Sequence, residues 1–163
     1  MRIELNFVDE GVTAKATLLK ERAPGLCSML WAAMESSFED LCVHAMFTGR
    51  ELSFPLGSDR IDDAALLLPP ENQTVFPIPG DLVWNAYHPY QWEGNPAPVY
   101  DFGIFYGRNS RILLPMGWRP STHFGCIDEN LEEFAQVAAR CQLEGRKRLR
   151  ISRIPGLKAG AGT

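Results

Sequence analysis

Apolar and polar side chains alternate from the first residues of the chain. Residues 2–7 (RIELNF) place an apolar side chain at every second position, which is the period of a half-buried β-strand. Residues 9–11 (DEG) are typical of a tight turn, and the alternation resumes over 13–18 (TAKATL). The pattern therefore predicts an N-terminal β-hairpin.

The stretch 71–107 predicts two further strands separated by a long loop rich in Pro, aromatic and amide residues. Pro79-Gly80 favours a tight turn before the first strand, 81–87, and the second strand covers 99–106. Gly103 inside the second strand predicts a bulge or a close approach of another backbone or a ligand. The alternation over 81–87 predicts one face with Leu82, Trp84 and Ala86 and an opposite face with Val83, Asn85 and Tyr87.

Two segments show helical spacing instead. Pro24 fits the first turn of a short helix, and apolar residues recur after it at intervals of three and four. Residues 128–130 (DEN) supply capping and acidic residues for a second helix, which Gly145 ends. The chain then returns to strand alternation over 147–154. The apolar stripe of the second helix consists of Leu131, Phe134, Ala138 and Cys141.

Composition indicates a globular protein. With 163 residues, 45% apolar and 22% charged, the chain is long enough to bury a core without a disulfide or metal. We expect one domain over 1–155 and a flexible C-terminal tail at 156–163. No run of apolar residues suits a membrane span, and the acidic N-terminus does not resemble a signal peptide, so we expect a cytoplasmic protein. A net charge of −4 disfavours nucleic acid as a partner.

Motifs for a metal, a nucleotide or a catalytic nucleophile are absent from the sequence. The three histidines lie far apart and lack the spacing of a metal-binding motif. No nucleophile elbow, Walker motif or dinucleotide fingerprint occurs, and the four cysteines show no C-x-x-C spacing. We therefore expect no metal and no cofactor, and four reduced cysteines.

In the absence of these motifs, the sequence still contains aromatic and polar side chains that suit the rim of a ligand pocket. Trp and Tyr combine an apolar body with one hydrogen-bonding group, and a few polar side chains give such a pocket its specificity. Other roles stay open: core packing for the aromatics, a satisfied core histidine for His44, and backbone capping for Glu71 with Asn72. The predicted ligand-binding residues are His44, Glu71, Asn72, Trp84, Tyr106, Trp118 and His123.

Three motifs occur in chain order: Glu-Asn-x-Thr…Pro-x-Pro-Gly over 71–80, Tyr-Gly at 106–107 and His-Phe at 123–124. Together they resemble an uncharacterised bacterial cyclophilin-like family. The run 123–127 (HFGCI), followed by a helix and a closing strand, is also similar to the C-terminal third of cyclophilins. The resemblance implies a mainly β protein, a closed cyclophilin-like β-barrel of about eight strands with two short helices.

The same resemblance argues against the prolyl isomerase activity of cyclophilins. That activity relies on an arginine in a Ser-Phe-His-Arg run, which precedes a Gln-Gly-Gly-Asp segment. Here Ser37-Phe38 is followed by Glu39-Asp40, and no Gln-Gly-Gly-Asp occurs. Arg50, Arg108 and Arg119 stay open as replacements for the missing arginine, but nothing in the sequence places any of them. Because a fold does not carry a function, the missing motif counts for more than the shared architecture.

We therefore expect a small-molecule-binding protein of unknown reaction, with the ligand held in an aromatic cleft at the barrel rim. Whether the protein is an enzyme stays open. One alternative is a non-catalytic interaction module or homo-oligomeric subunit that uses the aromatic loop 87–92 as its contact surface. A less favoured alternative is a residual peptidyl-prolyl cis-trans isomerase.

Overall fold

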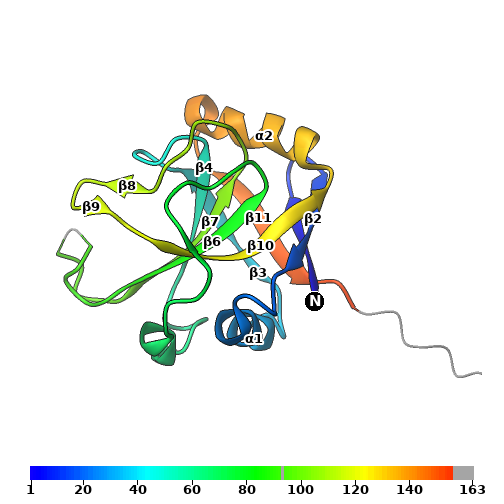
Figure 1. Cartoon of the computed structure of the whole chain (residues 1–163). Helices are drawn as coiled ribbons and strands as arrows, with labels where there is room; N and C mark the ends of the chain where they lie inside the picture. The colour runs from blue at the N-terminus through cyan, green and yellow to red at the C-terminus, as the bar shows by residue number, and fades with distance from the viewer. Residues whose placement is uncertain (93, 156–163) are drawn as a thin grey trace, which may run out of the picture.

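The computed structural model describes residues 1–92 and 94–155, and its main feature is a closed antiparallel β-barrel (Figure 1). The strands pair in the order β2-β1-β11-β3-β4-β7-β6-β10, and β10 pairs back with β2. A mainly β, closed eight-stranded barrel with two helices is thus confirmed. The barrel strands are β1 (Arg2–Phe7), β2 (Val12–Leu18), β3 (Phe38–His44), β4 (Glu51–Leu56), β6 (Asp81–Tyr87), β7 (Val99–Phe105), β10 (Ser121–Glu129) and β11 (Lys147–Arg153).

The described part of the chain forms four shorter elements besides the barrel strands and the two α-helices. The two-residue strand β5 (Gln73–Thr74) pairs with β10, and β8 (Leu113–Leu114) forms a small hairpin with β9 (Gly117–Trp118). A 3-10 helix, η1 (Asp63–Leu67), interrupts the long connection between β4 and β6.

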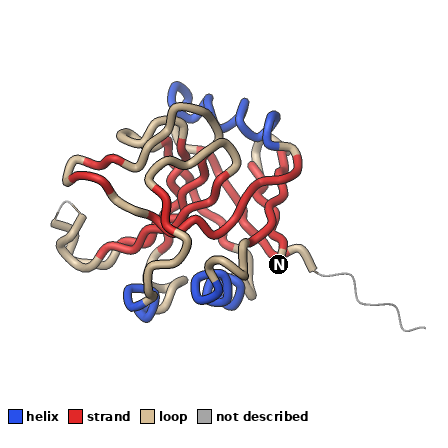
Figure 2. Tube along the Cα trace, in the orientation of Figure 1, coloured by secondary structure: helices blue, strands red, loops and turns tan. Residues whose placement is uncertain are grey.

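The two α-helices cover opposite ends of the barrel (Figures 1 and 2). Helix α1 (Pro24–Ala33) begins at the proline that the sequence predicted, and α2 (Leu131–Glu144) ends before Gly145, whose φ of 94° favours glycine. The apolar stripe of α2 packs on the barrel core, where the rings of Phe134 and Phe7 stack with centroids 4.6 Å apart.

The strands β4, β6 and β7 are covered on both faces. On β6, Leu82 and Trp84 join the core inside the barrel, whereas Val83 joins a second small cluster on the outer face with Phe105 and Ile112. The chain that follows β7 therefore covers the outer surface of these strands. This covering segment encloses the candidate functional site.

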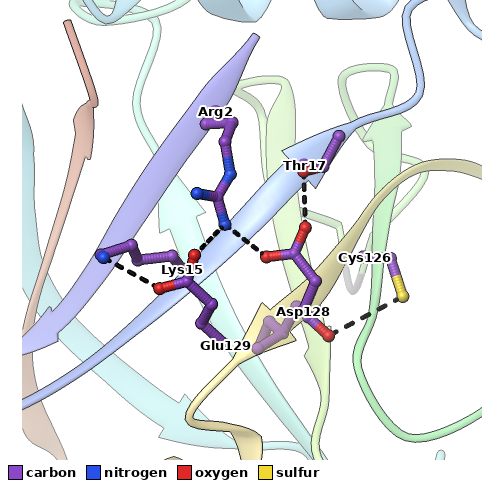
Figure 3. Close-up of polar contacts among 7 residues, drawn as sticks. Arg2, Lys15, Thr17, Cys126, Asp128 and Glu129 are labelled. Carbon is purple, nitrogen blue, oxygen red and sulfur yellow. Dashed lines mark hydrogen bonds and ion pairs between the residues drawn. The ribbon is translucent and has the colours of Figure 1, made fainter.

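The barrel closes along a polar seam between β2 and β10 (Figure 3). The Thr17 hydroxyl donates to Asp128 at 2.5 Å, and the Lys15 ammonium donates to Glu129 at 2.9 Å. The Arg2 guanidinium contacts both carboxylates at 2.7 Å. These contacts are exposed, so the seam faces solvent while the strands' other face supplies the core.

Three expectations from the sequence concern the chain as a whole. The flexible tail expected at 156–163 lies outside the described residues. Within the described part of the chain, no helix is long and apolar enough to cross a membrane. All four cysteines are free, and Cys27, Cys42 and Cys141 are buried.

Candidate functional site

The seven side chains predicted to bind a ligand occupy four separate places. His44 and Tyr106 contact each other, with 2.8 Å between His44 Nε2 and the tyrosine hydroxyl. Trp84 and Trp118 line one cavity. The remaining three residues, Glu71, Asn72 and His123, make contacts that organise the chain itself.

Glu71 caps helix α1. Its carboxylate accepts hydrogen bonds from the backbone N–H groups of Gly25 at 2.9 Å and Leu26 at 3.0 Å. The residue at the N-cap position, Ala23, has no side chain able to do this. Of the two roles left open for Glu71, the structure thus shows backbone capping, assisted by the positive end of the helix dipole.

Asn72 and His123 join the 71–80 segment to strand β10. The Asn72 amide donates to the His123 carbonyl at 2.7 Å, and the His123 N–H donates to the Asn72 carbonyl at 3.1 Å. The His123 ring nitrogen Nε2 lies 3.1 Å from the buried Asp81 carboxylate and 3.0 Å from the Gly125 carbonyl. These contacts give the Asn72 amide, the His123 ring and the Asp81 carboxylate partners within the protein.

A cleft of about 270 Å³ lies on the outer face of β4, β7 and β6. We call it the carboxyl cleft because its floor presents Glu51 from β4 and Asp101 from β7, with Asn85 and Tyr87 from β6 beside them. Its walls are largely apolar. They are formed by residues 43–48, which include His44, and by Ser53, Pro55, Trp92, Val99, Ile112 and Leu114.

The two carboxyl groups are held in an environment that favours their neutral forms. Glu51 is only 4% exposed, and burial together with the charge of Asp101 raises its pKa to about 8. Burial raises the pKa of Asp101 to about 6. The Thr48 hydroxyl donates to Glu51, and the Ser53 hydroxyl donates to Asp101 at 2.5 Å. Burial thus raises the pKa of both carboxyl groups, so the pair holds protons to a higher pH than exposed acids do.

Gly103 makes room for the Glu51 side chain. A Cβ atom at Gly103 would overlap Glu51 Oε1 and lie 2.8 Å from Val83 Cγ2. Strand pairing through Gly103 is regular on both sides, with Ser53 and Val83 as its partners. The predicted bulge is not observed at this glycine, and the group that approaches it is a side chain rather than the backbone or ligand that the sequence suggested.

A second cavity, of about 390 Å³, lies at the end of β6 near β9. We call it the tryptophan cavity because Trp84 and Trp118 both line it, together with Arg119. Asn85 lines this cavity and the carboxyl cleft, so the two are neighbours. Further lining residues include Pro69, Pro70, Gln73, His88, Gln91 and Thr122.

The histidines lie in three different surroundings. His44 lines the carboxyl cleft, His88 lines the tryptophan cavity and His123 contacts Asp81. Among the described residues, no group of three or more His, Cys, Asp or Glu side chains is placed to hold a metal ion.

Sequence reasoning did not single out Glu51, Asn85 or Asp101 as site residues. A signal was present, because Asp101 is the one charged residue within the aromatic run VYDFGIFY and must face something other than core. Its proximity to Glu51 was not visible, since it depends on the pairing of β4 with β7.

Comparisons with known proteins identify the fold and a family. A family model described as "Protein of unknown function (DUF3830)" matches residues 5–153. The chain is similar to the structure of McbB in complex with tryptophan, at 22% identity and a TM-score of 0.64, covering 99% of this chain and 46% of that one. It is also similar to the hypothetical protein AF2241 from Archaeoglobus fulgidus, at 16% identity and a TM-score of 0.57, covering 94% and 95%.

The extent of these likenesses limits what they carry. The chain spans about half the length of McbB, and at such identities each likeness concerns the fold alone. No curated protein matches the sequence.

Proposed function

The chain belongs to DUF3830, a family of proteins of unknown function, and we propose its function from the site: it binds a small molecule in the carboxyl cleft. One observation carries the proposal. Glu51 and Asp101 open on an apolar cleft, and among the described residues neither carboxyl group has a cationic partner. A charged group held away from water needs a partner, so the cleft favours a ligand that supplies one.

The lining defines the class of ligand. A basic nitrogen suits two carboxyl groups that have no cationic partner, and an N–H or carbonyl group suits whichever of them is protonated. Tyr87 and Trp92, with ring centroids 5.2 Å apart, offer flat apolar surface to the rest of the molecule. We infer an amine with an aromatic or otherwise apolar body. The complex of McbB with tryptophan supports small-molecule binding by this fold.

A matched pair of probes tests the proposal. Tryptamine carries an amine and an indole ring, whereas 3-propylindole has nearly the same shape with a methyl group in place of the amine. Isothermal titration should show tryptamine binding at least about tenfold more tightly, because an ionic hydrogen bond to Asp101 is lost in the neutral probe. Equal affinity for both probes, or binding of neither, would overturn the proposal.

Substitutions locate the binding. Asp101→Asn and Glu51→Gln keep the side-chain shapes, and the first should lower tryptamine affinity at least about tenfold. Glu35→Gln changes an exposed acid outside the cleft and is the control. If Asp101→Asn binds tryptamine as well as the wild type does, the amine is held elsewhere.

The interaction-module alternative has less support than the sequence suggested. In the loop 87–92, Tyr90 is 71% exposed, but Tyr87 is 5% exposed and packs against Trp92. Two of the three aromatics therefore form a wall of the cleft rather than a contact surface. Homo-oligomerisation through Tyr90 remains the alternative proposal, which sedimentation at several protein concentrations tests.

Prolyl isomerisation remains the least favoured reading. The described lining of the carboxyl cleft contains no arginine that could polarise a prolyl amide. Three expectations from the sequence stay predictions: kinship with bacterial cyclophilin-like proteins, a single domain over 1–155 and a cytoplasmic location.

A further inference from the structure

The tryptophan cavity has a charge character opposite to that of the carboxyl cleft. Its described lining contains no Asp or Glu and one fixed cation, Arg119. The Arg119 Nη2 atom donates to the Ala86 carbonyl at 2.7 Å, and the guanidinium carbon lies 4.8 Å above the Tyr87 ring centroid. These two contacts hold the guanidinium plane in place without neutralising its charge.

Arg119 also has unused hydrogen-bonding capacity. A guanidinium has five N–H donors, and the structure gives this one a single hydrogen bond. Its Nε atom is buried without a partner. Among the described residues, no carboxylate lies within ion-pair distance of it. A partly buried, oriented and unpaired guanidinium is the group that most readily takes a planar carboxylate in two parallel hydrogen bonds.

The two tryptophans supply the apolar part of the same cavity. Trp84 is 5% exposed, its ring stacks on Tyr100 with centroids 6.0 Å apart, and its indole N–H has no hydrogen-bond partner. Trp118 is 52% exposed and rests edge-on against Phe76. A buried N–H without a partner is uncommon in folded proteins and marks a place where an acceptor is missing. Arg119 and Trp84 both line this cavity, but their unpartnered Nε and Nε1 atoms are themselves buried, so a ligand in the cavity would meet the remaining guanidinium N–H groups of Arg119.

We propose that the tryptophan cavity is a second binding site, specific for a small organic carboxylate that carries a flat ring. The Arg119 guanidinium holds the carboxylate, and the exposed face of Trp118 covers the ring. A cavity of about 390 Å³ is within the size range of sites for such molecules. This site differs from the carboxyl cleft in its ligand, because the acids of that cleft would repel a carboxylate, although Asn85 lines both cavities.

Two probes of equal shape distinguish charge recognition from simple apolar binding. Indole-3-acetate carries the carboxylate, and indole-3-acetamide replaces it with a neutral amide. The chain has four tryptophans, so a 15N-labelled sample gives four indole N–H resonances, which single Trp→Phe variants assign. We expect indole-3-acetate to shift the Trp84 and Trp118 resonances and to bind at least about tenfold more tightly than the amide. Equal binding of the two probes, or a shift confined to Trp92 of the carboxyl cleft, overturns the proposal.

A charge variant tests the assigned residue. Arg119→Gln should weaken indole-3-acetate at least about tenfold and leave the affinity for the amide unchanged. Arg111→Gln, in the same segment but exposed and outside the cavity lining, should bind both probes as the wild type does. An Arg119→Gln variant that keeps full affinity for the carboxylate overturns the assignment. The comparison of the two probes on the wild-type protein decides the matter if Arg119→Gln does not fold.

Discussion

Gly103 leaves the space that the Glu51 carboxyl group occupies at the floor of the carboxyl cleft. Glu51 projects outward from β4 over the neighbouring strand β7, where any side chain at position 103 would occupy the space that its carboxyl group fills. The absence of a Cβ there lets an acid lie flat against the sheet, away from water and beside Asp101. The raised pKa of Glu51 follows from that placement, because its first cause is burial.

We expect Gly103→Ala to destabilise the protein by about 1–3 kcal/mol, since the added methyl group overpacks a filled site. Urea unfolding of the wild type, Gly103→Ala, Glu51→Ala and the double variant forms a thermodynamic cycle that isolates the contact. The glycine substitution should cost less when Glu51 is already truncated, with a residual cost from Val83. Additive effects would mean that Glu51 does not occupy this space.

Glu51 should also make stability depend on pH. Its pKa is raised from 4.5 to about 8 in the folded state, so the folded protein binds more protons than the unfolded chain between these values. Stability from this group is therefore complete below about pH 4.5 and is lost as the pH rises through 8, with an upper limit of roughly 5 kcal/mol. Asp101, raised to about 6, acts in the same direction over a lower window.

Glu51→Gln removes the ionisation while keeping the shape. We expect this variant to gain stability relative to the wild type as the pH is raised from 5 to 9, measured by urea unfolding at each pH. Glu35→Gln replaces an exposed acid outside the cleft, and its free energy of unfolding should change with pH as that of the wild type does. Parallel profiles for Glu51→Gln as well would show that Glu51 titrates normally.

Secondary-structure elements were easier to predict than the site that they form. The period of two identified β1, β2 and β6, and Gly145 marked the end of α2, because these signals act between residues close in sequence. The predicted N-terminal capping of α2 was wrong, since Asn130 at the N-cap makes no side-chain cap hydrogen bond and Asp128 and Glu129 belong to β10. The alternation on β6 also separated Trp84 inside the barrel from Tyr87 outside it. The alternation does not reveal which strands pair across the sheet. Glu51 on β4 and Asp101 on β7 were therefore not recognised as lining the same cleft.

Glu71 illustrates the same limit at a helix. Sequence alone left two roles for it, ligand contact or capping, and the choice depended on α1, whose first turn lies more than forty residues earlier. Capping through a distant side chain leaves no local motif, because the usual cap immediately precedes the helix.

We expect Glu71→Ala to lower stability by about 0.5–2 kcal/mol, the usual range for loss of a helix cap. Glu71→Gln keeps an acceptor oxygen without the charge and should lose less. Tryptamine affinity should be unchanged in both variants, because Glu71 is not among the residues that line the carboxyl cleft. A tenfold loss of tryptamine affinity at an unchanged melting temperature would show that Glu71 acts in ligand binding rather than as a helix cap.

The whole barrel combines a polar seam with an apolar interior, and the two contribute differently to stability. The seam residues Asp128 and Glu129 are exposed, so solvent and salt screen their attraction to Arg2 and Lys15. Phe134 is fully buried and brings α2 onto the barrel through its stack with Phe7. Closure of the barrel should therefore depend on the core, with the seam selecting the register of β2 against β10.

This division gives a prediction for the molecule as a whole. Phe134→Ala should cost about 3–5 kcal/mol, because it leaves a cavity between α2 and the barrel, and the loss should not change with salt. The double variant Asp128→Asn, Glu129→Gln should lose only a small fraction of that, and the loss should shrink further in concentrated salt. Urea unfolding at low and high sodium chloride compares the two variants. If the seam variant proved as damaging as Phe134→Ala, β2–β10 closure would depend on its ion pairs rather than on the buried face behind them.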